Sequence, residues 1–376
     1  MRWRNGKGED APPPATPTVA GPVDASVGAA GPASGAPTSA RARTRPAVDV
    51  NLGVVDPDQL ATAVRRLVAR ALAEDLGHRG DVTSATTIPV DTKGRAHLVA
   101  RDPGVVAGLA VVTEVCAQVD PRITVELLLD DGACVERGDI IAEIIGPLRT
   151  VLTAERTLLN IVCQLSGVAT HTRAFAELLQ GTDCVVRDTR KTTPGLRLLE
   201  KAAVAAGGGA NHRIGLYDAI LVKDNHVAAA GGITEAATAA LRGAPVGVPV
   251  QVEVTSVDEA VLAIEAGVTD LLLDNFTPDA LRAALVVIDG RAAVEASGGI
   301  TLATARAYAE AGADRLAVGA LTHSAPALDL ALDVVEVTRG PTPPPSVAAA
   351  TPPATSAAAP ADVPSGDAAA SSDWEG

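Results

Sequence analysis

The sequence predicts an α/β protein in which a β/α barrel follows a smaller α+β domain. Short apolar runs recur from about Val185 onward, and each run ends in polar residues or glycine. Helical patterns fill the intervals, and the last four runs recur about every 21–31 residues, which is typical of repeated β-α units. Such units form a parallel sheet with right-handed crossovers, so we expect about six to seven strands in a closed or partly open barrel.

Four segments are predicted along the chain. Residues 1–50 and 339–376 are dominated by Ala, Pro, Ser, Thr and Gly, and we expect them to be disordered tails because they cannot bury enough apolar surface to offset chain entropy. Residues 51–153 are the predicted α+β domain, with a helix from Asp58 to about Leu76 followed by short strands and turns. Residues 154–338 are the predicted barrel domain, and a helical stretch over 153–180 links the two.

The barrel elements carry local signals of their own. The strands are short and rich in β-branched residues, and most lack alternation of apolar and polar residues, which suits strands covered on both faces. Between them, Ser256 and Glu259 form a capping box, Thr277 caps a helix that begins at Pro278, and Thr301 can cap the next helix.

A doubly wound open sheet is the structural alternative to a barrel. We favour the barrel because polar residues collect where each strand ends, and in a barrel those ends form one ring around one pocket. The residues at these ends are Arg190, Lys191, Lys223, Glu253, Asp274, Ser297 and Gly319.

The charge distribution restricts the class of ligand. The net charge of −14 argues against nonspecific binding of DNA or RNA, which needs a basic surface. Residues 187–223 differ from this average, because they hold seven Lys and Arg residues against three Asp and Glu residues. We therefore expect a local anion site in an acidic protein.

The chain also carries indications of its compartment. Neither an apolar signal segment nor a run of about 18 apolar residues occurs, so we expect no secretion and no membrane insertion. The cysteines Cys116, Cys134, Cys163 and Cys184 lie far apart, which favours reduced thiols in a cytoplasmic protein.

One segment is the most informative for chemistry. In R-D-T-R-K-T-T-P-G, two adjacent cations, Arg190 and Lys191, follow a strand and precede a turn, as in sites that bind carboxylate or phosphate. Taken alone, the segment could also be an exposed basic loop. Two later segments, G-G-G-A-N-H-R and V-K-D-N-H, add His212, Arg213 and Lys223 at neighbouring positions of the predicted ring.

Together with V-E-V, L-L-L-D-N, S-G-G-I and V-G-A-L-T-H-S, these segments occur in the order and spacing of one known family. The chain resembles the quinolinate phosphoribosyltransferases, also called nicotinate-nucleotide pyrophosphorylases. E-D-L-G-H-R-G-D-V-T and E-R-T-L-L-N match the first domain and connecting helix of that family, and the resemblance covers about residues 56–338. It implies transfer of phosphoribosyl from phosphoribosyl diphosphate to quinolinate with loss of CO₂, a step of de novo NAD biosynthesis that yields nicotinate mononucleotide and diphosphate.

The resemblance also implies which residues bind the substrate. The two adjacent carboxylates of quinolinate need several cations, and the family pattern assigns Arg190, Lys191, His212, Arg213 and Lys223 to that pocket, with Thr189 beside them. Arg156 is implied to reach the site of a neighbouring subunit, in a homodimer or a higher even oligomer with shared active sites. The alternative for Arg156 is a pair with Glu155 or another acid on its own helix.

The acids Glu253 and Asp274 lie at successive strand ends and could be an acid/base pair, Mg²⁺ ligands or acceptors for sugar hydroxyls. The pyridine nitrogen already has a lone pair, so the transfer needs no base. We therefore assign both acids to the ribose hydroxyls and to Mg²⁺ held partly through the diphosphate, and we group them with Lys191 as the catalytic residues. Either acid could instead simply pair with a nearby cation.

The phosphate group is expected at the last two strand ends. Glycines that precede a helix leave backbone N–H groups free to bind an anion, and late loops of barrels commonly bind phosphate. The residues of this predicted cradle are Ser297, Gly298, Gly299, Val318, Gly319 and Ala320. We expect His323 in a loop near this cradle and His171 on a helix surface.

The chain departs from the family pattern at one place. Relatives commonly have an aromatic residue and an arginine near the pocket where this chain has Ala202 and Ala205. Three rival functions remain: a ModD-like enzyme of the same fold, a transferase specific for nicotinate, and a homologue without activity that binds a phosphate ligand. Retention of the whole cation and acid set argues against the last.

Overall fold

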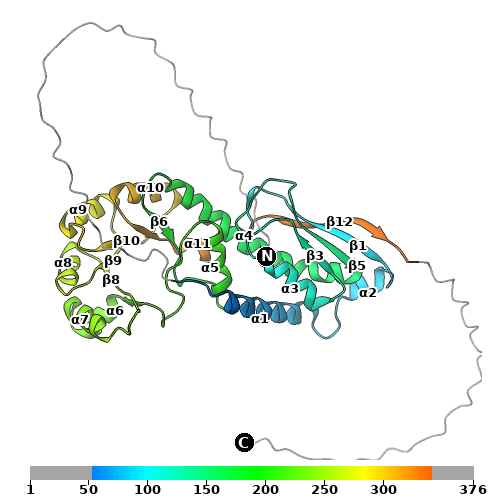
Figure 1. The fold of residues 1–376 in the computed structure, drawn as a ribbon, viewed down its shortest axis with the longest axis horizontal. Helices are drawn as coiled ribbons and strands as arrows, with labels where there is room; N and C mark the ends of the chain where they lie inside the picture. The colour runs from blue at the N-terminus through cyan, green and yellow to red at the C-terminus, as the bar shows by residue number, and fades with distance from the viewer. Residues whose placement is uncertain (1–52, 341–376) are drawn as a thin grey trace, which may run out of the picture. The chain divides into compact units, whose positions relative to one another are not determined.

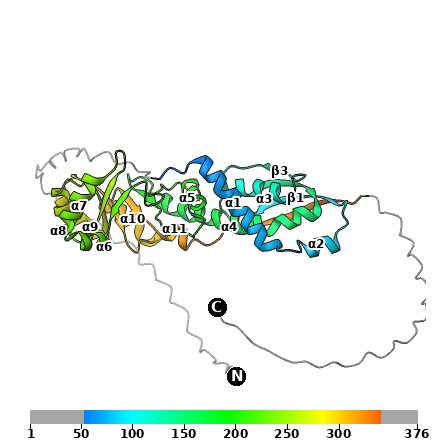
Figure 2. The ribbon, with the colours of Figure 1, turned by 90° about the horizontal axis from the view of Figure 1, so that it is seen from below.

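The computed structural model describes residues 53–340 (Figure 1). The predicted tails, 1–50 and all but two residues of 339–376, lie outside the described residues. Figure 2 shows two groups of elements within the described part: α1, α3 and β1 lie together, and α6 to α10 lie together.

The first group contains a four-stranded antiparallel sheet. Its strand order is β12-β1-β5-β3, made by β1 (Lys93–Ala100), β3 (Thr124–Leu127), β5 (Ile140–Pro147) and β12 (Leu330–Thr338). Helices α1 (Pro57–Leu76), α2 (Val82–Thr87) and α3 (Ala110–Val119) and the short ribbon of β2 (Gly104–Val105) with β4 (Cys134–Val135) complete this domain. The predicted α+β class of the domain is confirmed.

Helix α1 illustrates how local sequence sets an element. The Asp56 carboxylate accepts a hydrogen bond from the Gln59 N–H at 2.8 Å, and Pro57 supplies a first turn that needs no N–H donor. Val64, Val68 and Leu72 recur every four residues and are buried. The helix therefore packs one apolar stripe against the domain.

Helix α4 (Leu148–Leu178) belongs to both parts of the described chain. It contacts β1 and β5 on one side and α5 (Arg197–Ala206) and α10 (Leu302–Ala311) on the other. The predicted boundary between residues 153 and 154 therefore falls inside a continuous helix. His171, expected on a helix surface, is half-buried in α4 and packs edge-on against Phe175.

The end of the described chain needs a second correction. Residues 330–338 were assigned to the barrel, but they form β12, which pairs antiparallel with β1. Leu332 lies opposite Leu98, and Thr338 opposite Lys93. The partner strands are far apart in sequence, so no local pattern identified the pairing.

The second group is the predicted barrel. Six parallel strands follow the order β6-β11-β10-β9-β8-β7. They are β6 (Val185–Arg187), β7 (Ile220–Val222), β8 (Val250–Val254), β9 (Asp270–Asp274), β10 (Ala293–Ser297) and β11 (Arg315–Ala317). The helices that follow them are α5, α6 (Asp224–Ala230), α7 (Ile233–Gly243), α8 (Val257–Glu265), α9 (Pro278–Ile288), α10 and α11 (Ala320–His323).

The barrel is partly open. Between the edge strands β6 and β7, an isolated parallel bridge joins Arg187 to Ala210. The predicted fold class, a β/α barrel with an N-terminal α+β domain, is confirmed. The predicted caps at Ser256 and Thr277 are present, since each accepts a hydrogen bond from a backbone N–H at the start of α8 and α9. The second bond of the predicted capping box differs, because the Glu259 carboxylate accepts the N–H of Thr255 in place of that of Ser256.

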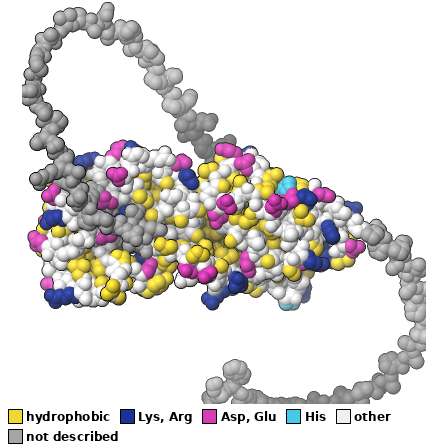
Figure 3. Space-filling view, in the orientation of Figure 1, with side chains coloured by type: hydrophobic (Ala, Val, Ile, Leu, Met, Phe, Trp, Pro, Cys, Tyr) yellow, Lys and Arg dark blue, Asp and Glu magenta, His cyan; other side chains and the backbone are white. Residues whose placement is uncertain are grey.

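The surface charges and the helices of the described residues bear on the kind of partner expected. On the face seen in Figure 3, Lys and Arg side chains are scattered among acidic ones and are not gathered in one area. No helix within residues 53–340 has the length and apolar character needed to cross a membrane.

Candidate functional site

A cavity of about 630 Å³ lies at the carboxyl ends of the barrel strands. Because the strands are parallel, their ends meet at one edge of the sheet and their terminal side chains share this space. The lining residues are Thr189, Arg190, Lys191, His212, Arg213, Leu221, Lys223, Glu253, Leu272, Asp274, Ser297, Gly298, Gly299, Ile300, Thr301, Ala317, Val318, Gly319, Ala320 and His323.

The cavity brings together every predicted site residue except Arg156. Arg156 is exposed on α4, and within residues 53–340 no acidic side chain lies within ion-pair distance of it, Glu155 included. The predicted set omitted the apolar wall formed by Leu221, Leu272 and Ile300. The first two could have been found, because each lies two residues before a predicted polar residue and so faces the same side of its strand.

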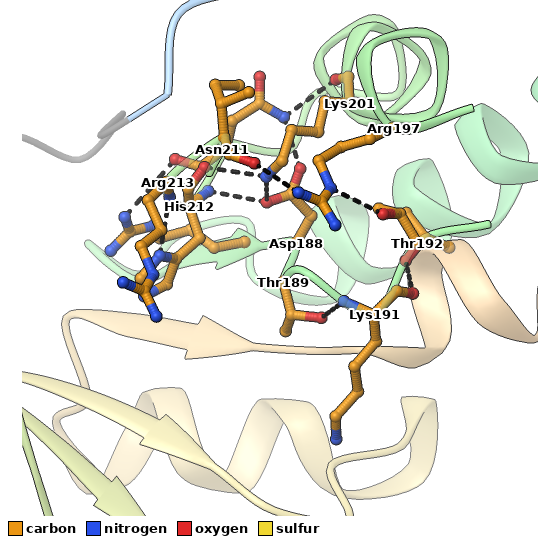
Figure 4. Close-up of polar contacts among 12 residues, drawn as sticks. Asp188, Thr189, Lys191, Thr192, Arg197, Lys201, Asn211, His212 and Arg213 are labelled. Atoms are coloured by element: carbon orange, nitrogen blue, oxygen red, sulfur yellow. Dashed lines mark hydrogen bonds and ion pairs between the residues drawn. The ribbon is translucent and has the colours of Figure 1, made fainter. Parts of the chain in front are cut away.

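The two cationic segments are joined by a buried carboxylate (Figure 4). Asp188 accepts hydrogen bonds from Lys201 Nζ at 2.6 Å, Asn211 Nδ2 at 2.7 Å and the His212 N–H at 2.8 Å. Lys201 is also fully buried and donates to the His212 carbonyl at 2.9 Å. Asp188, Lys201 and Asn211 together form a buried hub, which fixes the segment after β6 to the segment that carries His212 and Arg213.

The ionisation of the hub follows from its contacts. Burial raises the pKa of the Asp188 carboxyl, whereas the charge and hydrogen bond of Lys201 lower it. Burial likewise lowers the pKa of Lys201, and its charge and hydrogen-bond contact with Asp188 oppose that shift, so the three donors on this carboxylate stabilise the charged form of the pair. Sequence reasoning missed Asp188 as a site residue, although its place between a buried strand and two cations was a usable signal.

The turn after Lys191 is held from helix α5. The Glu200 carboxylate accepts the Thr193 N–H at 3.0 Å, and Arg197 Nε donates to Thr192 Oγ1 at 3.0 Å. Arg197 also donates to the Ile214 carbonyl at 3.1 Å. The segment is therefore pinned on both sides, which decides against a freely exposed basic loop.

Three cations at the cavity have no acidic partner. Arg190, Lys191 and Arg213 form no ion pair with any carboxylate in the described part of the chain. Burial and the neighbouring Arg190 both lower the pKa of Arg213, and among residues 53–340 its guanidinium donates only to a carbonyl, that of Ala219, at 3.0 Å. The Nε of Arg190 is buried and has no hydrogen-bond partner within residues 53–340. This excess of positive charge suits an anionic ligand.

His212 lines the cavity in a different charge state from the neighbouring arginines and lysine. Burial lowers the pKa of its imidazole to about 4, so the ring is neutral at pH 7. It therefore does not add to the positive charge that its place in the cationic set suggested.

The acids at the strand ends differ in their partners. Glu253 forms a short ion pair with Lys223, while Asp274 accepts a hydrogen bond from Asn275 Nδ2 at 2.7 Å. No group of three or more His, Cys, Asp and Glu side chains that could hold a metal occurs among residues 53–340. A divalent cation here would thus take at most two carboxylates from this chain and complete its shell with ligand oxygens and water, a set that fits Mg²⁺.

Glycines open the opposite side of the cavity. Gly298 and Gly299 both have positive φ, 99° and 61°, which places their backbone in the left-handed region just ahead of helix α10. A Cβ on Gly319 would lie 2.9 Å from Lys191 Cδ, so any larger residue there would require the lysine side chain to shift. His323, expected near this cradle, lines the cavity there.

The alanines that depart from the family pattern do not line the cavity. Ala202 is half-buried and Ala205 is exposed on α5. Neither alanine therefore contributes to the walls of this cavity.

Comparison with known proteins decides the family. The model for the quinolinate phosphoribosyl transferase N-terminal domain matches residues 81–166, and that for the C-terminal domain matches residues 168–333. The chain belongs to the quinolinate phosphoribosyltransferase family. It is therefore an enzyme of the pentosyltransferase class, as predicted.

Individual relatives agree with this family. The chain is 44% identical over 279 residues to nicotinate-nucleotide pyrophosphorylase (carboxylating) of Mycobacterium leprae, covering 72% of this chain and 97% of the relative. It is 40% identical over 271 residues to a probable enzyme of the same name from Bacillus subtilis, covering 72% and 93%. The solved nicotinate-nucleotide pyrophosphorylase of Francisella tularensis superposes with a TM-score of 0.71 at 39% identity, covering 76% of this chain and 99% of that one.

Proposed function

We propose that this family member transfers the phosphoribosyl group of phosphoribosyl diphosphate to quinolinate, with decarboxylation to nicotinate mononucleotide. The observation that carries the proposal is the cluster of Arg190, Lys191 and Arg213, three cations without acidic partners in the described chain, beside a glycine-lined cradle. Two adjacent carboxylates on one small ring would pair with the guanidinium groups of Arg190 and Arg213 and leave Lys191 for the diphosphate. A ligand with a single carboxylate would leave one guanidinium unpaired, and this is most costly for Arg213, which is buried.

The substrates would occupy the two sides of the cavity. Quinolinate would lie against the guanidinium groups of Arg190 and Arg213, with Thr189 and His212 as neighbouring walls. The 5-phosphate would bind the backbone of the cradle formed by Ser297, Gly298, Gly299, Val318, Gly319 and Ala320, ahead of α10 and α11. This arrangement places the ribose between the two sides.

The reaction then needs orientation and charge stabilisation more than acid/base chemistry. The bond between the anomeric carbon and diphosphate breaks, and the lone pair of the pyridine nitrogen forms the new bond from the opposite face. Glu253 and Asp274 would accept hydrogen bonds from the ribose hydroxyls and stabilise positive charge on the sugar, while Lys191 balances the charge of the departing diphosphate. Lys223, paired with Glu253, would hold that carboxylate in place.

Decarboxylation follows from the product of the first step. The ring is now a pyridinium cation, so the bond to the carboxylate beside the nitrogen can break with its electron pair held by the ring. A proton then replaces the lost CO₂ at that carbon. The cations around the carboxylates keep water from competing for them and hold the ring in place.

We further propose that Mg²⁺ accompanies phosphoribosyl diphosphate. When bound, it would neutralise charge on the diphosphate and make it a better leaving group. Glu253 and Asp274 are the residues that would hold it, partly through the diphosphate oxygens. Two carboxylates alone hold Mg²⁺ weakly, which agrees with a metal that enters with its substrate.

The proposed working unit is a homodimer or a higher even oligomer. Arg156 is exposed, has no acidic partner among the described residues, and lies outside its own cavity. In a two-fold assembly it would reach the quinolinate carboxylates of the partner chain, and the partner's arginine would do the same in return.

We place the enzyme in the cytoplasm because all four of its cysteines are free thiols.

One experiment tests the activity and its rivals. Purified protein is supplied with phosphoribosyl diphosphate, Mg²⁺ and either quinolinate or nicotinate, and release of CO₂ and diphosphate is measured. We expect equal amounts of both products from quinolinate and no turnover of nicotinate. Faster turnover of nicotinate would indicate a nicotinate-specific transferase, and no turnover of either would favour a ModD-like enzyme or a binding protein.

A further inference from the structure

A buried polar layer lies beneath the cavity floor, and Gln251 of β8 is at its centre. Gln251 is only 2% exposed, and its amide contacts three side chains. Its Nε2 donates to Glu295 Oε2 at 2.7 Å and to Asp270 Oδ1 at 3.0 Å. Its Oε1 lies 3.0 Å from Nε2 of His212.

The orientation of this amide is determined by its acidic neighbours. Glu295 and Asp270 are carboxylates held by buried arginines, Arg187 at 3.1 Å and Arg315 through a short contact, so they can only accept hydrogen bonds. The NH₂ group of Gln251 must therefore face them. Its carbonyl oxygen is left to face His212, and an oxygen can only accept.

The tautomer of His212 follows from two contacts. Nε2 must carry a hydrogen, because its neighbour on Gln251 is an acceptor. Nδ1 lies 2.8 Å from the backbone N–H of Arg213, which can only donate, so Nδ1 must be unprotonated. Both constraints give the same neutral Nε2–H imidazole, and both of its nitrogens are used within the protein.

We propose that Gln251 is a positioning residue that holds His212 as the neutral Nε2–H tautomer, so that His212 is an uncharged wall of the substrate cavity and not a charged ligand of the substrate. The part of this inference that concerns substrate rests on the proposed function, whereas the tautomer does not. Neither ring nitrogen is free for a carboxylate. The ring presents only its carbon edge and face to the cavity.

The charges around His212 do not reverse this assignment. The nearest carboxylate, Glu295, lies 3.8 Å from Nε2 and is occupied by Arg187 and Gln251. The positive charges of Arg187 and Lys201 disfavour protonation of the ring, in addition to the effect of burial. Asp188 accepts the backbone N–H of His212, and its charge is already balanced by the ion pair with Lys201.

This tautomer matters for the site because of Arg213. By accepting the Arg213 N–H, the unprotonated Nδ1 fixes the backbone from which that guanidinium enters the cavity. Protonation or rotation of the ring would place a hydrogen against this N–H and displace Arg213. Gln251 thus acts on substrate binding through His212 and Arg213 without touching the ligand.

The direct test is nuclear magnetic resonance of the full-length protein with ¹⁵N-labelled histidine. The signal of His212 is assigned as the one lost in the His212→Gln variant. We expect a protonated Nε2 and an unprotonated Nδ1, unchanged between about pH 5.5 and 8.5. A protonated Nδ1, or a titration with a midpoint near neutrality, would overturn the proposal whatever the enzyme's substrate is.

The second test separates a positioning role from a structural one. Gln251→Leu removes the acceptor, so we expect KM for quinolinate to rise about tenfold while KM for phosphoribosyl diphosphate changes less than about twofold. Gln59→Leu, a change of the same type at an exposed position of α1, is the matched control and should change neither. Equal effects on both KM values, or none in a folded Gln251→Leu protein, would contradict the positioning role. If that variant does not fold, the tautomer measured in the unaltered protein still decides the proposal.

Discussion

The buried pair of Asp188 and Lys201 allows a quantitative prediction for the Lys201→Met variant. The change removes two hydrogen bonds of Lys201 Nζ, to Asp188 at 2.6 Å and to the His212 carbonyl at 2.9 Å, and leaves a buried carboxylate without its counter-ion. Removal of one partner from a buried ion pair costs about 3–5 kcal/mol. A chain of this size loses roughly 2–4 °C of melting temperature per kcal/mol, so we expect a fall of about 6–20 °C.

The assay is thermal unfolding, measured by calorimetry, with Lys93→Met as the control. Lys93 is exposed at the start of β1, and its replacement should cost less than about 0.5 kcal/mol. In the double variant Asp188→Asn with Lys201→Met, part of the loss should return because no unpaired charge remains. A fall of less than about 2 °C in Lys201→Met would refute the argument that this pair holds the two cationic segments together.

Four further predictions concern the cavity. Arg213→Ala should raise KM for quinolinate roughly 10- to 150-fold, because a hydrogen bond to an ionised group contributes about 1.5–3 kcal/mol. Arg156→Ala and Lys191→Ala proteins should each be nearly inactive, but mixed dimers should regain about one good site in two, because one site collects both lesions and the other neither. Gly319→Ala should lower kcat/KM for phosphoribosyl diphosphate about tenfold or more by displacing the Lys191 side chain. The folded pKa of His212, about 4, lies below its ordinary 6.5, so its stabilising contribution is present above pH 6.5 and is lost as pH falls toward 4; roughly 1–2 kcal/mol of it should disappear between pH 6.5 and 5.

Each of these four predictions has a control or a result that would contradict it. Arg282→Ala removes an arginine of an exposed pair and should leave KM unchanged; an equal effect in Arg213→Ala and Arg282→Ala would exclude a site role for Arg213. Mixed dimers that are shown to have exchanged but recover no activity would place Arg156 in its own chain's site. Gly243→Ala, where a Cβ meets nothing within 4 Å, should be silent. The acid loss of unfolding free energy should be smaller by this amount in His212→Gln, and identical pH profiles would show that His212 is not buried neutral.

Much of the barrel and its cavity could be predicted from the sequence because one physical rule connects them. Short apolar runs without alternation identify strands covered on both faces, and parallel strands bring their final residues to one edge. That rule alone placed Arg190, Lys223, Glu253 and Asp274 around one cavity. The family resemblance added their chemistry.

Other features could not be predicted because they depend on pairing between distant residues. The antiparallel match of β12 with β1 leaves no trace in the periodicity of either strand. The hydrogen bonds of Gln251 reach β9, β10 and the segment before β7. The spacing of two residues places Gln251 on the same face of β8 as Glu253, but nothing in V-P-V-Q-V-E-V states which side chains Gln251 meets. The neutral state of His212 results mainly from its burial in the folded protein, so a motif that counts His212 among the cations overestimates the charge of the site.

The return of β12 to the first sheet has a consequence for how the protein is made. On the ribosome, β1 and β5 are synthesised long before residues 330–338, so β1 remains an unpaired sheet edge while the whole barrel emerges. The first domain can complete its sheet only after the barrel sequence has been synthesised and the last strand has left the ribosome. Truncation before β12 therefore exposes a backbone edge that can pair with other chains. We expect such fragments to aggregate in cells even though they retain the whole barrel.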